Sequence, residues 1–241
     1  MKAMILAAGL GTRLRPLTDN RPKALVEVAG RTLLEIVIAR LREFGVRELI
    51  VNAHHFAGMV TEYLREKNNF GMRIEISQED ILLDTGGGLK KAEWFFGEED
   101  PAPFILHNVD VISTIDLRRM IDFHTESQAL ATLAVQQRQT SRYLLFDEQM
   151  RLCGRRLVKE QKTELVRPSP QLQELAFSGI HVISPRFLRL MTEEGAFSII
   201  QSYLRLAGQG ERIAAYRADG DSWRDVGKPE SIARAAEDLK K

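Results

Sequence analysis

Cysteine is nearly absent from this chain of 241 residues, in which Cys153 stands alone. A single cysteine excludes an internal disulfide and a cysteine-based zinc cluster, so we expect Cys153 to be a small buried hydrophobic residue. No apolar stretch approaches the roughly 18 residues that a membrane-spanning helix needs. The short apolar run after Lys2 leads directly into a glycine turn, which predicts a first strand rather than a signal peptide. These absences predict a cytoplasmic protein with no membrane partner.

An excess of charge of either sign is also lacking. The chain has 34 basic and 33 acidic side chains, and its formal net charge is +1. This balance gives no general attraction to nucleic acid. The five histidines show no metal-ligand spacing, and His124 and His181 lie on apolar faces, which is typical of core histidines. No repeat, low-complexity tract or linker divides the chain, so we expect residues 1–241 to form a single α/β domain.

Strand-like and helix-like segments alternate along the first half of the chain, which favours a mostly parallel sheet. Expected strands here are 4–8, 48–52, 73–77 and 104–108, and expected helices are 33–44, 57–66, 85–96 and 117–125. The second half has expected strands at 131–136, 143–146, 176–183 and 213–217, and expected helices at 185–192, 198–207 and 230–239. The polar segment 160–174 contains two prolines and is expected to be an exposed loop.

The most informative segment lies between residues 5 and 25. An apolar run ends abruptly in Gly9-Leu10-Gly11, and basic residues follow with prolines between them. Small residues let a ligand approach the backbone closely, and free backbone N–H groups there bind anions. Arg13 and Lys23 can then neutralise a polyphosphate. The segment predicts a site for a nucleoside triphosphate at the end of a strand.

Two common phosphate loops do not fit this segment. The dinucleotide fingerprint needs a third glycine where Leu14 stands, and Pro16 and Pro22 argue against a long helix that opens from the loop. The Walker pattern is absent. The remaining alternative is a plain glycine turn that joins a strand to a surface loop.

The segment from Leu6 to Leu14, with Pro22-Lys23 downstream, resembles the signature of the sugar-1-phosphate nucleotidyltransferases, or nucleotide-sugar pyrophosphorylases. The resemblance extends from Met1 to at least Gly227. It implies a Rossmann-like, three-layer αβα fold with a mixed, mainly parallel sheet. The N-terminal half would bind the nucleotide, and the C-terminal half would complete the sugar pocket. No hexapeptide repeat of the C-terminal β-helix that some relatives carry is evident.

The resemblance assigns roles to the glycine loop and to the basic residues after it. Arg13 matches the arginine that contacts the β- and γ-phosphates. Lys23 matches the lysine between the triphosphate and the attacking sugar phosphate. These are the candidate catalytic residues, because two anions must be brought together and their repulsion screened. The candidate nucleotide-binding residues of the loop are Leu6, Ala7, Ala8, Gly9, Gly11 and Thr12.

Two aspartates are candidate ligands of Mg²⁺. Asp110 follows the expected strand 104–108, at the end of a strand where open α/β sheets bind ligands, and its carboxylate can hold the ion through oxygen. Relatives commonly have Gly-Asp where this chain has Val109-Asp110. Segment 223–227 (Trp-Arg-Asp-Val-Gly) resembles the family's W-x-D-V-G-T motif, whose aspartate, here Asp225, is the second metal ligand. The plain alternative for both aspartates is a turn residue.

Other segments resemble the family's base and sugar contacts. The run Asp84-Thr85-Gly86-Gly87-Gly88 offers close backbone approach and N–H donors, and it implies a nucleotide contact at Gly87. Gln78 could read a base edge through its amide, or it could be an ordinary surface glutamine. The run Phe177-Ser178-Gly179-Ile180 resembles a sugar-pocket segment in which Gly179 leaves room for a hexose. Asn108 is a further candidate sugar contact.

One element of the family is not matched. Many relatives carry Glu-Lys-Pro before the sugar-pocket segment, and its lysine holds the sugar phosphate. Residues 158–161 of this chain are Val-Lys-Glu-Gln instead. Lys159 is a candidate by position alone, and the anchor of the sugar phosphate is left unassigned.

The resemblance implies transfer of a nucleotidyl group from a nucleoside triphosphate (NTP) to a sugar 1-phosphate, with Mg²⁺ as cofactor and release of pyrophosphate. The chain resembles most the short N-acetylmuramate-1-phosphate uridylyltransferases, and nearly as much the mannose- and heptose-1-phosphate guanylyltransferases. We expect UTP or GTP to be preferred, leaning to UTP. Both bases offer a carbonyl acceptor beside an imide-type N–H, whereas adenine and cytosine would leave a buried group unpaired.

Two alternatives stay open at this point. A cytidylyltransferase for phosphocholine or a related alcohol phosphate would need an aromatic cage for the ammonium, and no aromatic cluster lies near the motifs. A non-catalytic nucleotide-sugar-binding regulator would be favoured by loss of Lys23, Asp110 or Asp225, and all three are present. A monomer or small homo-oligomer is expected.

Overall fold

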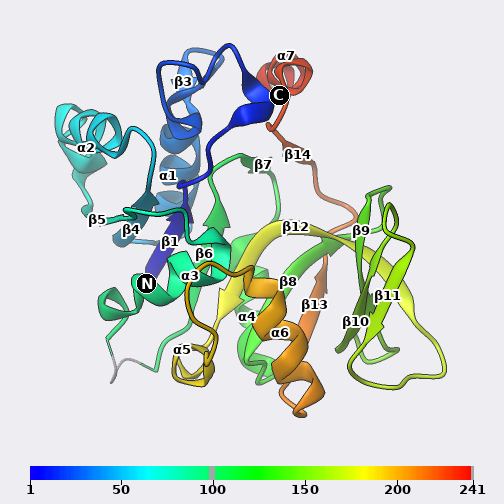
Figure 1. Cartoon of the computed structure of the whole chain (residues 1–241). Coiled ribbons are helices and arrows are strands. Elements are labelled where there is room, and N and C mark those ends of the chain that lie inside the picture. Colours follow the sequence, from blue (N-terminus) through cyan, green and yellow to red (C-terminus); the bar gives the residue numbers. More distant parts are fainter. Residues whose placement is uncertain (98–100, 240–241) are drawn as a thin grey trace.

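The computed structural model describes residues 1–97 and 101–239, and a ten-stranded mixed sheet forms its centre (Figure 1). The path through the sheet is β11-β10-β9-β12-β6-β1-β4-β5, with β8 on β12 and β13 on β8. The parallel strands of the first half are β1 (Lys2–Leu6), β4 (Glu48–Ala53), β5 (Arg73–Gln78) and β6 (Phe104–Asn108). The strands of the second half pair mostly antiparallel, apart from the parallel pair β8 and β13. They are β8 (Ala131–Gln136), β9 (Arg142–Phe146), β10 (Leu152–Leu157), β11 (Lys162–Leu165), β12 (Gln173–Ile183) and β13 (Ile213–Arg217).

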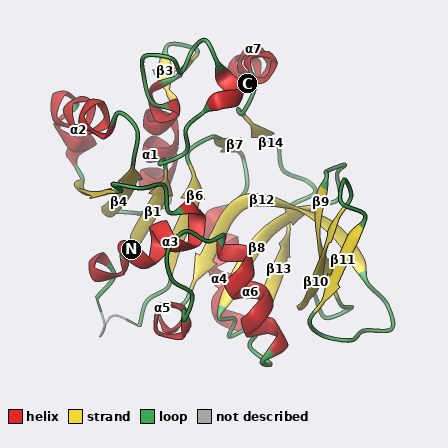
Figure 2. Ribbon diagram, in the orientation of Figure 1, coloured by secondary structure: helices red, strands yellow, loops and turns green. Residues whose placement is uncertain are grey.

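Helices pack on both faces of this sheet and make three layers (Figure 2). Side chains alternate along each strand. Ala3 and Ile5 of β1 therefore join one hydrophobic cluster, and Met4 joins the other. The first cluster includes α1 (Leu33–Glu43), α2 (Ala57–Glu66), α4 (Leu117–Glu126) and α7 (Pro229–Asp238). The second includes α3 (Asp84–Lys91), α5 (Arg186–Leu190) and α6 (Ile199–Gly208). This arrangement confirms the expected fold class.

The helix boundaries follow local capping rules. The Thr32 hydroxyl accepts a hydrogen bond from the Glu35 amide at 3.1 Å, so α1 begins at Leu33 as predicted. Gly45, at φ 87°, follows the helix in the left-handed conformation that glycine adopts readily. The expected helix 85–96 is shorter, because α3 ends at Lys91 and a 3₁₀ turn follows over Glu93–Phe95. None of the described helices is long and apolar enough to cross a membrane.

The exposed loop predicted over 160–174 is wrong in part. Residues Lys162–Leu165 form the edge strand β11, antiparallel to β10. Gly154 allows this pairing, because a Cβ there would collide with the carbonyl oxygen of Glu164. The polar composition of β11 suits an exposed edge, which is why a pattern search for buried strands misses it. Strand β1 also ends two residues before the expected 4–8 run does, which leaves Ala7 and Ala8 in the loop.

Short ribbons that the sequence did not predict complete the fold. They are β2 (Glu27–Val28) with β3 (Arg31–Thr32), and β7 (Val111–Ser113) with β14 (Trp223–Asp225). The second ribbon brings two segments distant in sequence to the same side of the sheet (Figure 1). It decides the position of the site described below.

Buried histidines sit in the core, as predicted for His124 and His181. His124 is hydrogen-bonded to the Thr132 hydroxyl at 2.9 Å and to the Ser184 hydroxyl at 3.0 Å. Nδ1 of His181 lies 2.8 Å from the Tyr203 hydroxyl. Burial lowers the pKa of His124 from 6.5 to about 4, because the imidazolium loses its hydration.

The lowered pKa of His124 predicts a loss of stability in acid. A folded-state pKa below the unfolded value means that its contribution is fully present above about pH 6.5 and is lost as the pH falls toward 4. Between roughly pH 7 and 5, the unfolding free energy of the wild type should therefore fall by about 2 kcal/mol more than that of His124→Gln. Urea denaturation at both pH values measures this difference. His55→Gln, which alters an exposed histidine, is the control, and an unchanged pH slope in His124→Gln would contradict the assignment.

Candidate active site

The glycine loop leaves the carboxyl end of β1, between the ends of β4 and β6. A buried chain of hydrogen bonds supports it. The Ala7 amide donates to Asn52 Oδ1 at 2.7 Å, and Asn52 Nδ2 donates to Glu79 Oε1 at 2.6 Å. Glu79 Oε2 accepts from the Leu83 amide at 2.9 Å. The loop is therefore tied to β4, to the end of β5 and to the segment before α3.

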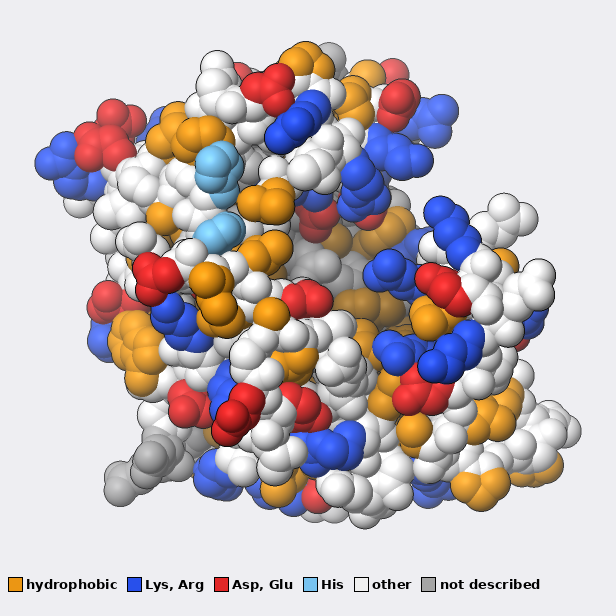
Figure 3. Space-filling view, viewed as in Figure 1, with side chains coloured by type: hydrophobic (Ala, Val, Ile, Leu, Met, Phe, Trp, Pro, Cys, Tyr) orange, Lys and Arg blue, Asp and Glu red, His pale blue; other side chains and the backbone are white. Residues whose placement is uncertain are grey.

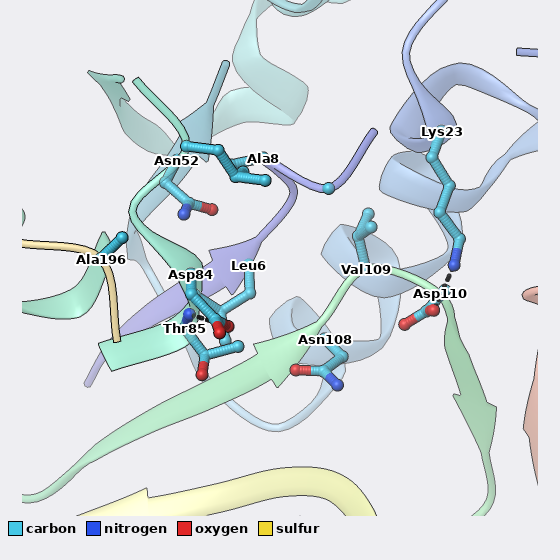
Figure 4. Close-up of a pocket in the computed structure, with 12 residues that line it drawn as sticks. Leu6, Ala8, Lys23, Asn52, Asp84, Thr85, Asn108, Val109, Asp110 and Ala196 are labelled. Carbon is cyan, nitrogen blue, oxygen red and sulfur yellow. Dashed lines mark hydrogen bonds and ion pairs between the residues drawn. The ribbon is translucent and has the colours of Figure 1, made fainter. Parts of the chain in front are cut away.

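A first cavity of about 450 Å³ opens at these strand ends (Figure 4). Its walls carry the small residues of the loop and the polar residues that begin α3. Asn108, which ends β6, and Asp110, which follows it, form the border with a second cavity. The residues that line the first cavity are Leu6, Ala8, Gly9, Lys23, Asn52, Leu82, Asp84, Thr85, Asn108, Val109, Asp110 and Ala196.

The second cavity has a volume of about 580 Å³ and lies between the two halves of the chain. Figure 3 shows the hollow, with Lys and Arg side chains gathered on the side of β9, β10 and β11. Its basic residues are Arg13, Arg138, Arg142 and Arg155. Its acidic residues are Asp110, Glu160 and Asp225. Other lining residues include Tyr143, Phe177, Ser178, Gly179 and Trp223.

Charged residues from four segments meet where the cavities adjoin. Lys23 is only 8% exposed, and its ammonium forms an ion pair with Asp110 (Figure 4). The β7–β14 ribbon brings Asp225 to the same place, and the Val226 amide donates to the Asp110 carbonyl at 2.8 Å. A Cβ on Gly227 would lie 2.5 Å from Asp225 Oδ1 and 2.8 Å from Arg13 Nη2. Glycine at 227 thus leaves room for both groups.

The electrostatics around Asp110 and Asp225 favours a bound cation. Asp225 Oδ1 is buried with no hydrogen-bond partner among the described residues. Burial raises the pKa of Asp225, and the neighbouring Asp110 carboxylate raises it further. A divalent cation would relieve both costs, and paired carboxylates are the protein ligands that Mg²⁺ commonly takes beside phosphates. The residues present therefore fit the metal.

The candidate sugar contacts also lie together. The β8–β12 pairing shifts register between Phe177 and His181. Within this bulge Gly179 has φ 75°, and a Cβ there would lie 2.8 Å from Asn108 Nδ2. A side chain at this position would be strained and would collide. Both Gly179 and Asn108 line the second cavity.

The glycines of the first turns of α3 lie in close contact with other parts of the protein. A Cβ at Gly86 would collide with the Phe197 ring, and one at Gly87 with the Gly195 carbonyl. A Cβ at Gly88 would lie 2.8 Å from Glu79 Oε1. These glycines thus permit close packing inside the protein, and the Gly87 amide donates to the Phe197 carbonyl at 3.3 Å. Their neighbours Asp84 and Thr85 line the first cavity instead.

Several other predicted residues do not line either cavity among the described residues. Gln78 is exposed at the end of β5. Gly11, at φ 65°, caps the 3₁₀ turn Thr12–Leu14. Ala7 is in the loop, and its amide is hydrogen-bonded to Asn52. Contacts of these residues or Gly87 with a ligand stay predictions. Sequence reasoning missed Glu79, because an acidic residue after an expected strand carries no periodic signal of burial.

Comparison with known proteins identifies the class. A model of the nucleotidyl transferase family matches residues 2–241, so the chain belongs to that family. It is 34% identical over 237 residues to the N-acetylmuramate alpha-1-phosphate uridylyltransferase of Caulobacter vibrioides, an alignment that covers 95% of this chain and 93% of the relative. It is 28% identical over 239 residues to the mannose-1-phosphate guanyltransferase of Yarrowia lipolytica, and this alignment covers 96% of this chain and 62% of that protein.

A solved structure agrees with the fold. The putative glucose-1-phosphate thymidylyltransferase of Bacillus anthracis, in complex with sucrose, superposes with a TM-score of 0.81 at 19% identity. The superposition covers 100% of this chain and 96% of that chain. This likeness confirms the fold, and the family match over residues 2–241 confirms the resemblance that the sequence carries.

The support beneath the loop generates a prediction. Glu79→Gln keeps the side-chain shape but places an NH₂ group against either the Asn52 amide or the Leu83 N–H, so one donor loses its acceptor. We expect a loss of about 1–3 kcal/mol in unfolding free energy, and weaker binding of a nucleoside triphosphate, because the loop loses its support. Urea denaturation and titration calorimetry measure the two effects. Glu75→Gln on β5, the strand that Glu79 follows, is the control, and equal behaviour of the two variants would refute the role of Glu79.

Proposed function

We propose that this protein transfers a nucleotidyl group from UTP or GTP to a sugar 1-phosphate and releases pyrophosphate. The observation that carries the proposal is the meeting of Arg13, Lys23, Asp110 and Asp225 at the border of two cavities. Transfer between two phosphorylated substrates needs two adjoining sites with cationic groups at their border. Membership of the nucleotidyl transferase family supports the same reaction.

The residues divide between two substrates. We assign the nucleotide to the first cavity, against Leu6, Ala8 and Gly9, and the sugar to the second cavity, against Asn108 and Gly179. An oxygen of the sugar phosphate would attack the α-phosphorus. The bond to the bridging oxygen of the β-phosphate would break, and pyrophosphate would leave with the electron pair. No enzyme nucleophile is needed in this scheme.

Lys23 has the central electrostatic role in this scheme. Its ammonium pairs with Asp110 at the border of the two cavities. From this position Lys23 would also reach the phosphates of both substrates, whose mutual repulsion it would screen. Arg13 would hold the β- and γ-phosphates beside it.

Asp110 and Asp225 would hold Mg²⁺. When bound, this ion supplies positive charge that polarises the phosphoryl oxygens. The carboxylates orient it at the border of the cavities, where the two phosphate groups would meet.

Four arginines in the second cavity argue against phosphocholine as a substrate. A quaternary ammonium gains from aromatic faces and is repelled by guanidinium groups. A sugar 1-phosphate carries a dianionic group and many hydroxyls, which suit such walls. The charge of the cavity therefore favours the sugar phosphate over the alcohol phosphate of the cytidylyltransferase alternative.

The test is pyrophosphate release, with four NTPs crossed against a panel of sugar 1-phosphates. We expect UTP or GTP to be used in preference to ATP and CTP, with UTP favoured. The uridylyltransferase relative, aligned over 93% of its length, supports that order. A clear preference for ATP or CTP would overturn the nucleotide assignment. Absence of release with every sugar 1-phosphate would overturn the proposed function itself.

A second prediction concerns the metal ligands. Asp225→Asn keeps the shape of the side chain and removes its charge, so turnover should fall by a factor on the order of a hundred or more. Saturating Mg²⁺ should not restore it. The fold should be preserved, because removal of one of two buried like charges relieves repulsion. Asp122→Asn on the exposed face of α4 is the control. Full activity of Asp225→Asn would rule out Asp225 as a metal ligand.

A further inference from the structure

Arg138 is held rigidly at the wall of the second cavity, in the loop after β8. Its guanidinium stacks on the Trp223 ring, 3.6 Å from the ring centroid. Its Nη2 donates to the Phe177 carbonyl at 2.6 Å, and Trp223 Nε1 donates to the Ser178 carbonyl at 2.7 Å. Both side chains are thus fixed to the same stretch of β12. A planar cation held this way loses little conformational entropy when it binds a ligand.

No carboxylate of the described residues forms an ion pair with Arg138, and the Asp225 charge acts on it only from a longer distance. Arg155 in the same cavity pairs with Glu164 at 2.8 Å. Over residues 1–97 and 101–239, no acidic oxygen lies within ion-pair distance of Arg138. Its Nε is buried and unpartnered. A partly buried cation without a paired carboxylate costs free energy, which a bound anion would recover.

The position of Arg138 in the fold indicates which anion it would bind. It lines the second cavity and not the first. Its stacking partner Trp223 begins β14, and Asp225 ends it, so the guanidinium lies toward the metal-binding end of the cavity. Lys159, the only candidate by sequence position, is exposed and lines neither cavity. A phosphate group that must meet the α-phosphorus has to bind at this end.

We infer that Arg138 binds the phosphate of the sugar 1-phosphate, as a guanidinium anchor preset by the Trp223 stack. This inference rests on the proposed function. A guanidinium presents paired N–H donors that match two phosphate oxygens, so the contact orients the attacking group as well as neutralising it. Arg142 and Arg155, on the hairpin of β9 and β10, line the same cavity and would be left to contact the rest of the sugar.

Steady-state kinetics of Arg138→Gln and Arg138→Lys test the inference. Loss of a charge-assisted contact should raise the KM for the sugar 1-phosphate roughly 10- to 100-fold in Arg138→Gln. The KM for the nucleotide should change little, because the nucleotide lies in the other cavity. Arg138→Lys should fall between, since it keeps the charge and loses the paired donors. Added guanidinium at a non-denaturing concentration should restore part of the activity of Arg138→Ala, an effect that a merely structural arginine would not give.

The control is Arg156→Gln, which removes an exposed arginine of β10 that pairs with Glu174 at 2.6 Å. Calorimetric binding of UTP or GTP verifies that each variant is folded. If the wild type uses a sugar 1-phosphate and Arg138→Gln keeps its KM for it, the inference is wrong. A parallel rise of both KM values, or no rescue by guanidinium, also overturns it. A wild type inactive with every sugar 1-phosphate removes the proposed function, and the inference falls with it.

Discussion

The proximity of two carboxylates is the constraint on which the rest of this site depends. Asp110 and Asp225 are brought together by the β7–β14 ribbon, and burial and mutual repulsion raise the pKa of Asp225. Folding can hold them there only because positive charge is close by. Lys23 pairs with Asp110, and Arg13 lies beside Asp225 across Gly227. The folded chain therefore gathers charges of both signs at one point, which suits the proposed binding of a cation and of phosphates there.

Two rigid supports lie on either side of that point, one beside each cavity. On one side, the chain of bonds from Ala7 through Asn52 to Glu79 holds the glycine loop against the sheet. On the other, the Arg138–Trp223 stack is tied to the bulged part of β12. Neither support is made of loop residues alone, because the first includes Asn52 of β4 and the second includes Trp223 of β14 and residues of β12. Such bracing keeps reacting groups in place without reorganisation during the reaction.

Comparison of particular residues explains where sequence reasoning succeeded and failed. The helix at 33–44 was predictable because Thr32 caps it and its apolar residues recur at helical spacing. The glycine run at 86–88 was assigned to ligand approach, whereas its crowded neighbours are Phe197, Gly195 and the Asn52–Glu79 pair. Strand β11 was missed because its own composition does not indicate a strand. It is a strand because it pairs with β10. Arg138 carried no signal, since its surroundings come from β12 and β14.

The sequence by itself determined the α/β class, the family and the identity of the groups at the centre of the site: Arg13, Lys23, Asp110 and Asp225. It could do so because periodic burial and a compact motif are local properties that a short window contains. Only the tertiary structure decided which of the candidate contacts line a cavity, which glycines serve packing, and that the Arg138 guanidinium lines the second cavity. These depend on distances between segments far apart in the chain, and burial and electrostatic energies exist only once such segments meet.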